Sequence, residues 1–165
     1  MPGKTMDAML KDRPDRSQRL EPRATSATRA LHTYDYAIIR VVPRVERGEF
    51  VNAGAIVSCP QQRFLEARIE LDKQRLRALD SHVDMESVRA HLESITRICA
   101  GGAAAGPIGQ LSQRERFHWL VAPRSALIQT SPVHTGRCGD PATLLEHLIE
   151  VMVRPPHPLP GTEEP

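Results

Sequence analysis

The chain has 165 residues, of which 40% are hydrophobic and 25% are charged, with 14 prolines, three cysteines and six aromatic residues. This length allows one globular domain of roughly 100–150 residues with additional terminal segments. No apolar run approaches the roughly 18–20 residues that span a bilayer, and residues 1–30 hold no apolar stretch typical of a secretory signal. Three cysteines without a C-x-x-C pair favour a reducing compartment. We therefore expect a cytoplasmic protein without membrane association.

The excess of positive charge lies outside the central part of the chain. Residues 1–30 carry a net charge of +3, residues 31–153 are neutral and residues 154–165 carry −1. The first segment is rich in charged residues, Ser and Thr, and the last contains five prolines. We expect a disordered basic extension and a disordered proline-rich tail on either side of a single domain at 31–153. A neutral domain without a basic helix face predicts no nucleic-acid partner.

Three strands are predicted in the first half of this domain. Residues 34–42 (YDYAIIRVV) and 50–59 (FVNAGAIVSC) are rich in β-branched and apolar residues, and a loop with Pro43 and Gly48 separates them. Residues 64–71 alternate apolar with charged side chains, which indicates one face in water. Three consecutive strands with short connections predict an antiparallel meander.

Two helices follow the strands. Asp72 and Asp84 have the position of N-cap residues, the first for a short helix that ends at Leu79 and the second for a longer helix that Gly101 ends. Apolar residues in the longer helix recur at intervals of three and four. This spacing predicts one buried stripe along the helix.

The sequence leaves the conformation of residues 113–121 open. Ser112 and Glu115 form a capping-box pattern, which predicts a helix. Alternate apolar residues in the same segment also fit a strand. They are Phe117, Trp119 and Val121.

The last part of the domain is predicted to hold one more strand and one more helix. Residues 127–130 have strand character, and Asp140 followed by Pro141 begins a helix that ends before Pro155. Its expected buried face comprises Leu144, Leu145, Leu148, Val151 and Met152. The fold class we predict is α+β: an antiparallel sheet, made of the meander plus a later strand or strands, with helices packed on one face.

No complete catalytic motif is present. The chain lacks a Walker A loop, a dinucleotide-binding fingerprint and a nucleophile elbow, and no pair of carboxylates indicates acid–base catalysis. His134 and Cys138 are spaced as metal ligands can be, but zinc sites use three or four protein ligands. We expect no metal and no cofactor. The sequence leaves enzymatic activity open and favours a protein without it.

Two polar side chains interrupt the predicted apolar strands. Arg40 shares a face of the first strand with Ile38, and Asn52 shares a face of the second with residues such as Ile56. Burying either group without a hydrogen-bond partner costs several kcal/mol. One alternative is an internal ion pair between Arg40 and Glu46, Glu49 or Asp35. The other alternative is a pocket in which five side chains converge on an anionic group, namely Arg40, Asn52, His118, Arg124 and His134.

Three segments resemble one bacterial protein family. They are YDYAIIRVVPRVERGEFVNAGAIV (34–57), RIELDKQRLRALD (68–80) and ERFHWLVAPRSALIQTSPVHTG (115–136). These segments are similar to the hallmark segments of domain of unknown function 3037, and the resemblance covers about residues 31–153. It carries no known activity over to this chain.

The resemblance nevertheless implies a partner and a set of polar positions. Members of the family are associated with gene neighbourhoods that encode HipA-like kinases, which implies an accessory role beside a protein partner. The recurring polar positions of the family are Arg40, Arg44, Glu49, Asn52, Arg116, Arg124, Ser131 and His134, to which the pocket hypothesis adds His118.

Two functional hypotheses follow from the sequence. The first is a non-enzymatic interaction module for a protein partner, which a HipA-like kinase encoded nearby would fit. The alternative is a protein that binds a small anionic ligand, or a phosphate-directed enzyme, with an Arg/His pocket.

Overall fold

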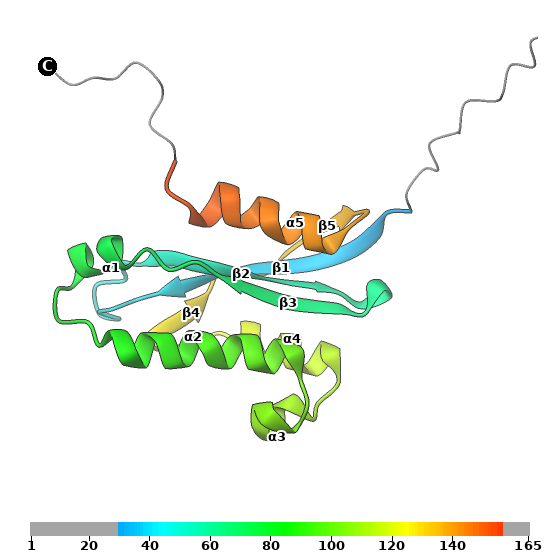
Figure 1. Cartoon of the computed structure of the whole chain (residues 1–165), viewed down its shortest axis with the longest axis horizontal. Coiled ribbons are helices and arrows are strands. Elements are labelled where there is room, and N and C mark those ends of the chain that lie inside the picture. Colours follow the sequence, from blue (N-terminus) through cyan, green and yellow to red (C-terminus); the bar gives the residue numbers. More distant parts are fainter. Residues whose placement is uncertain (1–29, 157–165) are drawn as a thin grey trace, which may run out of the picture.

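A five-stranded antiparallel sheet forms the middle layer of the protein, and helices lie on both of its faces (Figure 1). The computed structural model describes residues 30–156. Of the predicted disordered segments, residues 1–29 and 157–165 lie outside the described residues. The predicted α+β class with an antiparallel sheet is confirmed.

The sheet begins with the predicted meander. Strands β1 (His32–Val41), β2 (Val51–Cys59) and β3 (Phe64–Ile69) pair consecutively and antiparallel. Two short strands, β4 (Ile128–Thr130) and β5 (His134–Cys138), both pair with β1 on its other side, β4 near its end and β5 near its beginning. Strand β3 therefore forms one edge of the sheet, and β4 and β5 share the opposite one.

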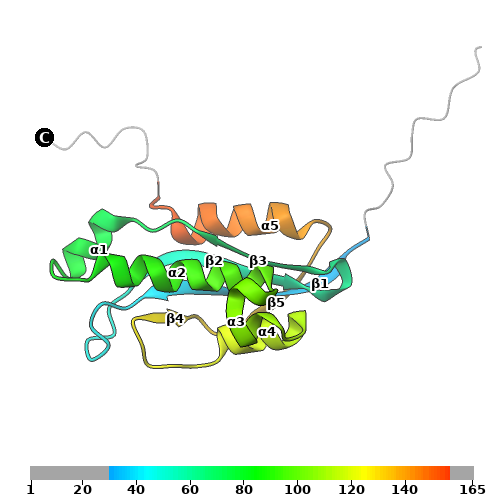
Figure 2. The same cartoon turned by 60° about the horizontal axis from the view of Figure 1, so that its bottom comes forward.

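Four helices lie on one side of the sheet or at its end, as Figure 2 shows. They are α1 (Lys73–Leu79), α2 (Met85–Ala100), α3 (Gly106–Gly109) and α4 (Gln113–Val121). Asp72 and Asp84 accept hydrogen bonds from the first backbone N–H groups of α1 and α2, as predicted. The capping box of Ser112 and Glu115 is formed, so 113–121 is a helix. Helices α2 and α4 bury Leu92 and Phe117 against this face of the sheet.

The C-terminal helix covers the opposite face, which corrects the prediction that helices pack on one face. Helix α5 (Pro141–Leu148) continues into a π-helical turn, η3 (Ile149–Val153). Leu145 and Ile149 pack here against Val57 of β2. The reason is that β2 is buried along both faces, so each face needs an apolar cover.

The π turn also changes which residues of the last helix are buried. Ile149 and Val153 are buried, whereas Val151 and Met152 are exposed, contrary to the predicted buried face. A π turn closes its hydrogen bond over one more residue than an α turn does. The added residue rotates the side chains that follow, so the predicted spacing fails at this turn.

A β-bulge divides β2 into two parts. Ile39 pairs with Gly54 and Arg40 pairs with Asn52, which leaves Ala53 as the extra residue. The bulge reverses the alternation of side chains along the strand. Asn52 therefore faces the α5 layer, on the opposite face from Ile56, and the prediction that these two residues share a face is wrong.

Four charged side chains fasten the end of α5 to β3. Arg68 pairs with Glu146, and Arg154 donates hydrogen bonds to both Glu70 and Glu146. The two Arg154–Glu70 bonds measure 2.7 and 2.8 Å between nitrogen and oxygen. The hydrogen bond from Arg154 lowers the pKa of Glu70 below its ordinary value.

Acidification should weaken this charged cluster. Because the pKa of Glu70 is lowered in the folded state, its contribution to stability is complete above its ordinary pKa of 4.5. The contribution is lost as the pH falls through the folded-state value. Urea unfolding at pH 7 and at successively lower pH should show this decline, and Arg154→Met should reduce its size. An equal decline in wild type and Arg154→Met would contradict the assignment.

Candidate functional site

Arg40 and Arg124 meet at a cavity of about 560 Å³ beyond the ends of β1 and β4. The loop from β1 to β2 forms one wall, and the segment between α4 and β4 forms another. The residues that line it are Arg40, Val42, Val45, Gly48, Phe50, Pro123, Arg124, Ser125 and Gln129. This lining contains two guanidinium groups and no carboxylate, so the cavity is positively charged.

The Arg40 side chain lacks a counter-charge. Its guanidinium carbon lies 4.3 Å from the centre of the Phe50 ring, a cation–π distance. The Nε atom is buried and has no hydrogen-bond partner among the described residues. Most buried polar atoms of native proteins have such a partner. Among the described residues, Asn52 Oδ1 and Arg116 Nε also lack one, and of these three side chains only Arg40 lines this cavity.

Asn52 lies directly opposite Arg40 in the β1–β2 ladder. Its amide nitrogen donates a 2.8 Å hydrogen bond to the carbonyl oxygen of Met152 and so fastens β2 to the end of η3. The amide oxygen is buried and, within residues 30–156, has no partner. Two unsatisfied polar atoms, one on each strand, therefore belong to one cross-strand pair.

Arg124 is held by contacts with two residues of the same segment, Trp119 and Ala122. Its guanidinium carbon lies 4.6 Å from the ring centre of Trp119, and its Nη2 donates a 2.5 Å hydrogen bond to the Trp119 carbonyl oxygen. A longer bond of 3.4 Å joins Nε to the carbonyl oxygen of Ala122. These contacts fix the side chain at the cavity and use only part of its hydrogen-bonding capacity.

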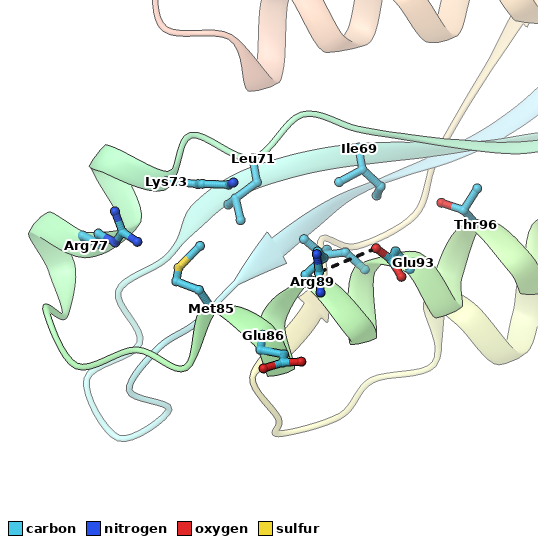
Figure 3. A pocket seen from close by; sticks show the side chains of 10 residues that line it. Ile69, Leu71, Lys73, Arg77, Met85, Glu86, Arg89, Glu93 and Thr96 are labelled. Carbon is cyan, nitrogen blue, oxygen red and sulfur yellow. Dashed lines mark ion pairs between the residues drawn. The ribbon is translucent and has the colours of Figure 1, made fainter.

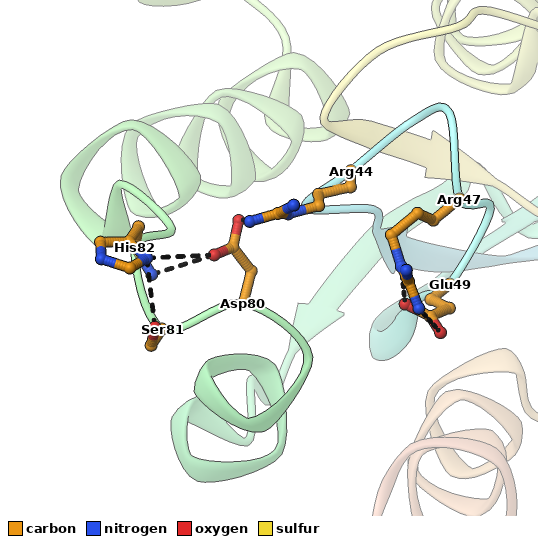
Figure 4. A network of polar contacts seen from close by, with 6 residues as sticks. All are labelled: Arg44, Arg47, Glu49, Asp80, Ser81 and His82. Carbon is orange, nitrogen blue, oxygen red and sulfur yellow. Dashed lines mark hydrogen bonds and ion pairs between the residues drawn. The ribbon is translucent and has the colours of Figure 1, made fainter.

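The predicted internal ion pair of Arg40 does not form. Glu49 instead accepts two hydrogen bonds from Arg47, at 2.7 and 2.8 Å, and these lower its pKa (Figure 4). Asp35 accepts a hydrogen bond from Thr135. No ion pair joins Arg40 to a carboxylate in the part of the chain that the structure describes.

Arg44 lies in the same loop but contacts another part of the fold. Its Nε is 3.4 Å from a carboxylate oxygen of Asp80, in the loop between α1 and α2 (Figure 4). The pKa of Asp80 is lowered, first by a hydrogen bond from the backbone N–H of His82 and then by Arg44. Arg44 and Glu49 therefore fasten surface loops.

Two further candidates have structural roles. Arg116 donates hydrogen bonds from Nη1 to the carbonyl oxygens of Ile98 and Cys99, at 2.8 and 2.6 Å, and thereby caps the end of α2. The buried Ser131 hydroxyl accepts a bond from the Ile38 N–H and donates one to the Pro132 carbonyl oxygen. Its proton is engaged with the Pro132 carbonyl oxygen, so Ser131 is not poised as a nucleophile.

The two histidines lie away from the cavity, which corrects the prediction that five side chains converge. His134 begins β5, where it pairs with Tyr36 and stacks on its ring at 5.1 Å between centroids. That position is four residues before Arg40 along β1. His118 is exposed on α4 and does not line the cavity. Of the five residues, only Arg40 and Arg124 line it.

The structure adds Phe50, Val45 and Gln129 to the site. Phe50 stacks on Arg40, and Gln129 of β4 pairs with Arg40 across the ladder. The sequence contained one signal for Phe50, which is an aromatic residue two positions before Asn52 in the predicted second strand. The loop that brings Val45 to the same wall has no sequence pattern that predicts this placement.

The fold and the cavity define an α+β protein with an arginine-lined cavity. Residues 36–153 match a family model described as a protein of unknown function (DUF3037), so the chain belongs to this family, as its sequence resemblance predicts. No curated protein and no solved structure matches the chain. Among residues 30–156, every helix is too short or too polar to cross a bilayer.

Arg116 should matter for stability. Hydrogen bonds to charged groups contribute about 1.5–3 kcal/mol each, so Arg116→Met should lower the free energy of unfolding by about 2 kcal/mol or more. Arg114→Met, an exposed change in the same helix, should alter it by less than about 0.5 kcal/mol. Urea denaturation of both variants measures the difference. Equal stability of the two variants would contradict the capping role.

Proposed function

We propose that this protein is a non-enzymatic binding module that recognises an anionic group, a carboxylate or a phosphate, in the Arg40–Arg124 cavity. The observation that carries the proposal is Arg40, a guanidinium with a buried, unpartnered Nε in a cavity without a carboxylate. A polar atom that is buried without a hydrogen-bond partner costs stability. A side chain that lowers the stability of the free protein and lies at an accessible cavity is often one that binds a ligand.

The geometry of the two arginines suits an anion with two or more oxygens. A guanidinium is a planar fork that binds carboxylate or phosphate oxygens with paired N–H groups. Phe50 and Trp119 contact the two guanidinium groups at cation–π distances. The Nη groups of Arg40 and Nη1 of Arg124 make no hydrogen bond to another described residue and therefore remain available for a ligand.

The lining supports binding more than turnover. Ser125 is its one hydroxyl side chain, and neither a histidine nor a carboxylate lines the cavity beside it. A serine nucleophile needs an adjacent base for activation. The arrangement therefore supplies recognition without the groups that acyl or phosphoryl transfer would require.

Apolar side chains next to Arg40 favour an anion that is carried by a protein partner. Val45 and Phe50 in the cavity wall are 40% and 43% exposed, and Met152, which accepts the Asn52 hydrogen bond, is 42% exposed. Arginine and aromatic residues together are common among the energetically dominant residues of interfaces. An acidic side chain of the partner would then enter the cavity, and a HipA-like kinase is the partner that the family resemblance implies.

Thermal unfolding of the full chain tests the anion site. Phosphate, citrate and an acidic peptide containing glutamate should be compared with chloride at equal ionic strength. At a ligand concentration about 100 times Kd, binding adds about 2.7 kcal/mol of stability, which raises Tm. Arg40→Met and Arg124→Met should abolish the rise, whereas Arg89→Met, which removes an exposed arginine of α2, should retain it.

The ligand-free variants provide a second, independent readout. Because the buried Nε of Arg40 has no hydrogen-bond partner among the described residues, Arg40→Met should leave Tm unchanged or raise it. A response to phosphate or citrate indicates a small-molecule ligand, and a response to the peptide alone indicates a protein partner. If none of the three anions shifts Tm, or if Arg40→Met lowers the ligand-free Tm, the proposal is wrong.

A further inference from the structure

Strand β3 leaves one of its two edges unpaired. It is the last strand of the sheet, and in the described part of the chain it pairs only with β2. Figure 1 shows it at the front of the sheet, between the layer of α5 and the layer of α2. An open strand edge is a template for another strand, because its backbone groups can continue the ladder.

The direction of the backbone groups follows from one hydrogen bond. The Glu70 N–H donates to the Ala53 carbonyl oxygen at 2.8 Å, so it points toward β2. In an antiparallel ladder, alternate residues direct their N–H and C=O groups to the same side. The register from β2 to β3 has no shift. The backbone groups of Leu65, Ala67 and Ile69 therefore point away from β2, toward the open edge.

The usual protections of an edge strand are lacking here. Natural proteins block such edges with proline, bulges, very short strands or charges that repel a partner strand. Strand β3 has six residues, no proline and no bulge. Its two charged residues, Glu66 and Arg68, have opposite signs and lie on either side of Ala67. These charges complement a second copy of the same strand.

We propose that β3 pairs antiparallel with β3 of a second copy of this chain, with the two-fold axis at Ala67, so that the two sheets become one. In this register, Leu65 and Ile69 of one copy form hydrogen-bonded pairs with Ile69 and Leu65 of the other. Ala67 lies opposite itself. Glu66 lies opposite Arg68 of the second copy in both directions, which places two ion pairs across the axis.

Neighbouring registers are disfavoured by the same two charges. A pairing centred on Glu66 places that carboxylate opposite itself. A pairing centred on Arg68 places that guanidinium opposite itself and Glu66 opposite Glu70. Like charges directly opposite each other destabilise a sheet, so these two registers are less favourable than the register centred on Ala67.

The surface beside the edge has room for side chains of the second copy. A hollow of about 580 Å³ lies between the end of β3 and α2, with Ile69 and Leu71 on one side and Met85 on the other (Figure 3). Leu92 also lines it, together with the charged and polar side chains Lys73, Arg77, Glu86, Arg89, Glu93 and Thr96. Leu65 of the second copy, placed opposite Ile69, would lie at this hollow. Burial of these apolar groups adds a hydrophobic contribution to the backbone hydrogen bonds.

Charge exchange tests this interface with the full-length chain. Sedimentation equilibrium should give a wild-type mass of twice 18.4 kDa that falls on dilution. Glu66→Arg and Arg68→Glu should each be monomeric, because like charges then face each other across the axis. An equimolar mixture of the two variants should be dimeric, since every Arg then faces a Glu. Arg75→Glu, the same change on α1 away from the edge, should remain dimeric.

Several outcomes would overturn the inference. They are a monomeric wild type at every concentration, a dimeric Glu66→Arg, and a mixture of two folded variants that stays monomeric. Glu66 makes no ion pair or side-chain hydrogen bond with another described residue, so Glu66→Arg should fold normally, as circular dichroism would verify. Arg68 binds Glu146; if Arg68→Glu is unfolded, the mass of Glu66→Arg alone decides. The test does not involve the anion cavity, whose proposal stands or fails separately.

Discussion

The burial of β2 on both faces is the constraint on which the rest of the structure depends. Every residue from Ala53 to Cys59 is buried, and the strand has no polar side that water can cover. Such a strand is stable only between two apolar layers. Helix α2 provides one layer against Ile56, and α5 with its π turn provides the other against Val57.

The candidate site lies where this two-sided burial ends. The bulge at Ala53 turns Asn52 toward the end of η3, and Arg40 lies opposite it on β1. Beyond this pair the sheet gives way to loops, which carry Phe50 and Arg124 to the cavity. The Nε atom of Arg40 is buried in the interior, where a polar atom without a hydrogen-bond partner costs stability. The loops form the open cavity through which a ligand can reach the side chain. Binding residues are often placed in this way, on loops that a rigid scaffold positions.

Much of the fold could be predicted from local patterns. The meander, the caps at Asp72 and Asp84 and the capping box at Ser112 depend on neighbouring residues, so their signals are complete within a few positions. The bulge and the π turn each involve one extra residue and leave no comparable signal. They caused the errors at Asn52 and at the last turn of the final helix. The second helical layer was missed because the polar side of β3 indicated water.

Part of the candidate site could also be predicted from local sequence patterns. Arg40 was recognisable because a charged residue within an apolar strand is unusual, and this argument needs no tertiary structure. Which residues surround it depends on loop conformation and on strand pairing across long sequence distances. Trp119 and Arg124 approach one another within one segment, whereas the placement of His134 was decided by the register of β5 on β1. The number of residues that separates a side chain from Arg124 therefore does not show whether that side chain lies at the cavity.

The bulge at Ala53 makes the chain length of β2 matter for the candidate site. Removal of one residue there would restore regular alternation along β2 and carry the side chain before it to the α2 face of the sheet. The amide that lies opposite Arg40 would then be withdrawn from that strand pair. Deletion of Ala53, which removes no polar side chain, would therefore change the polar groups that surround Arg40 through chain length alone.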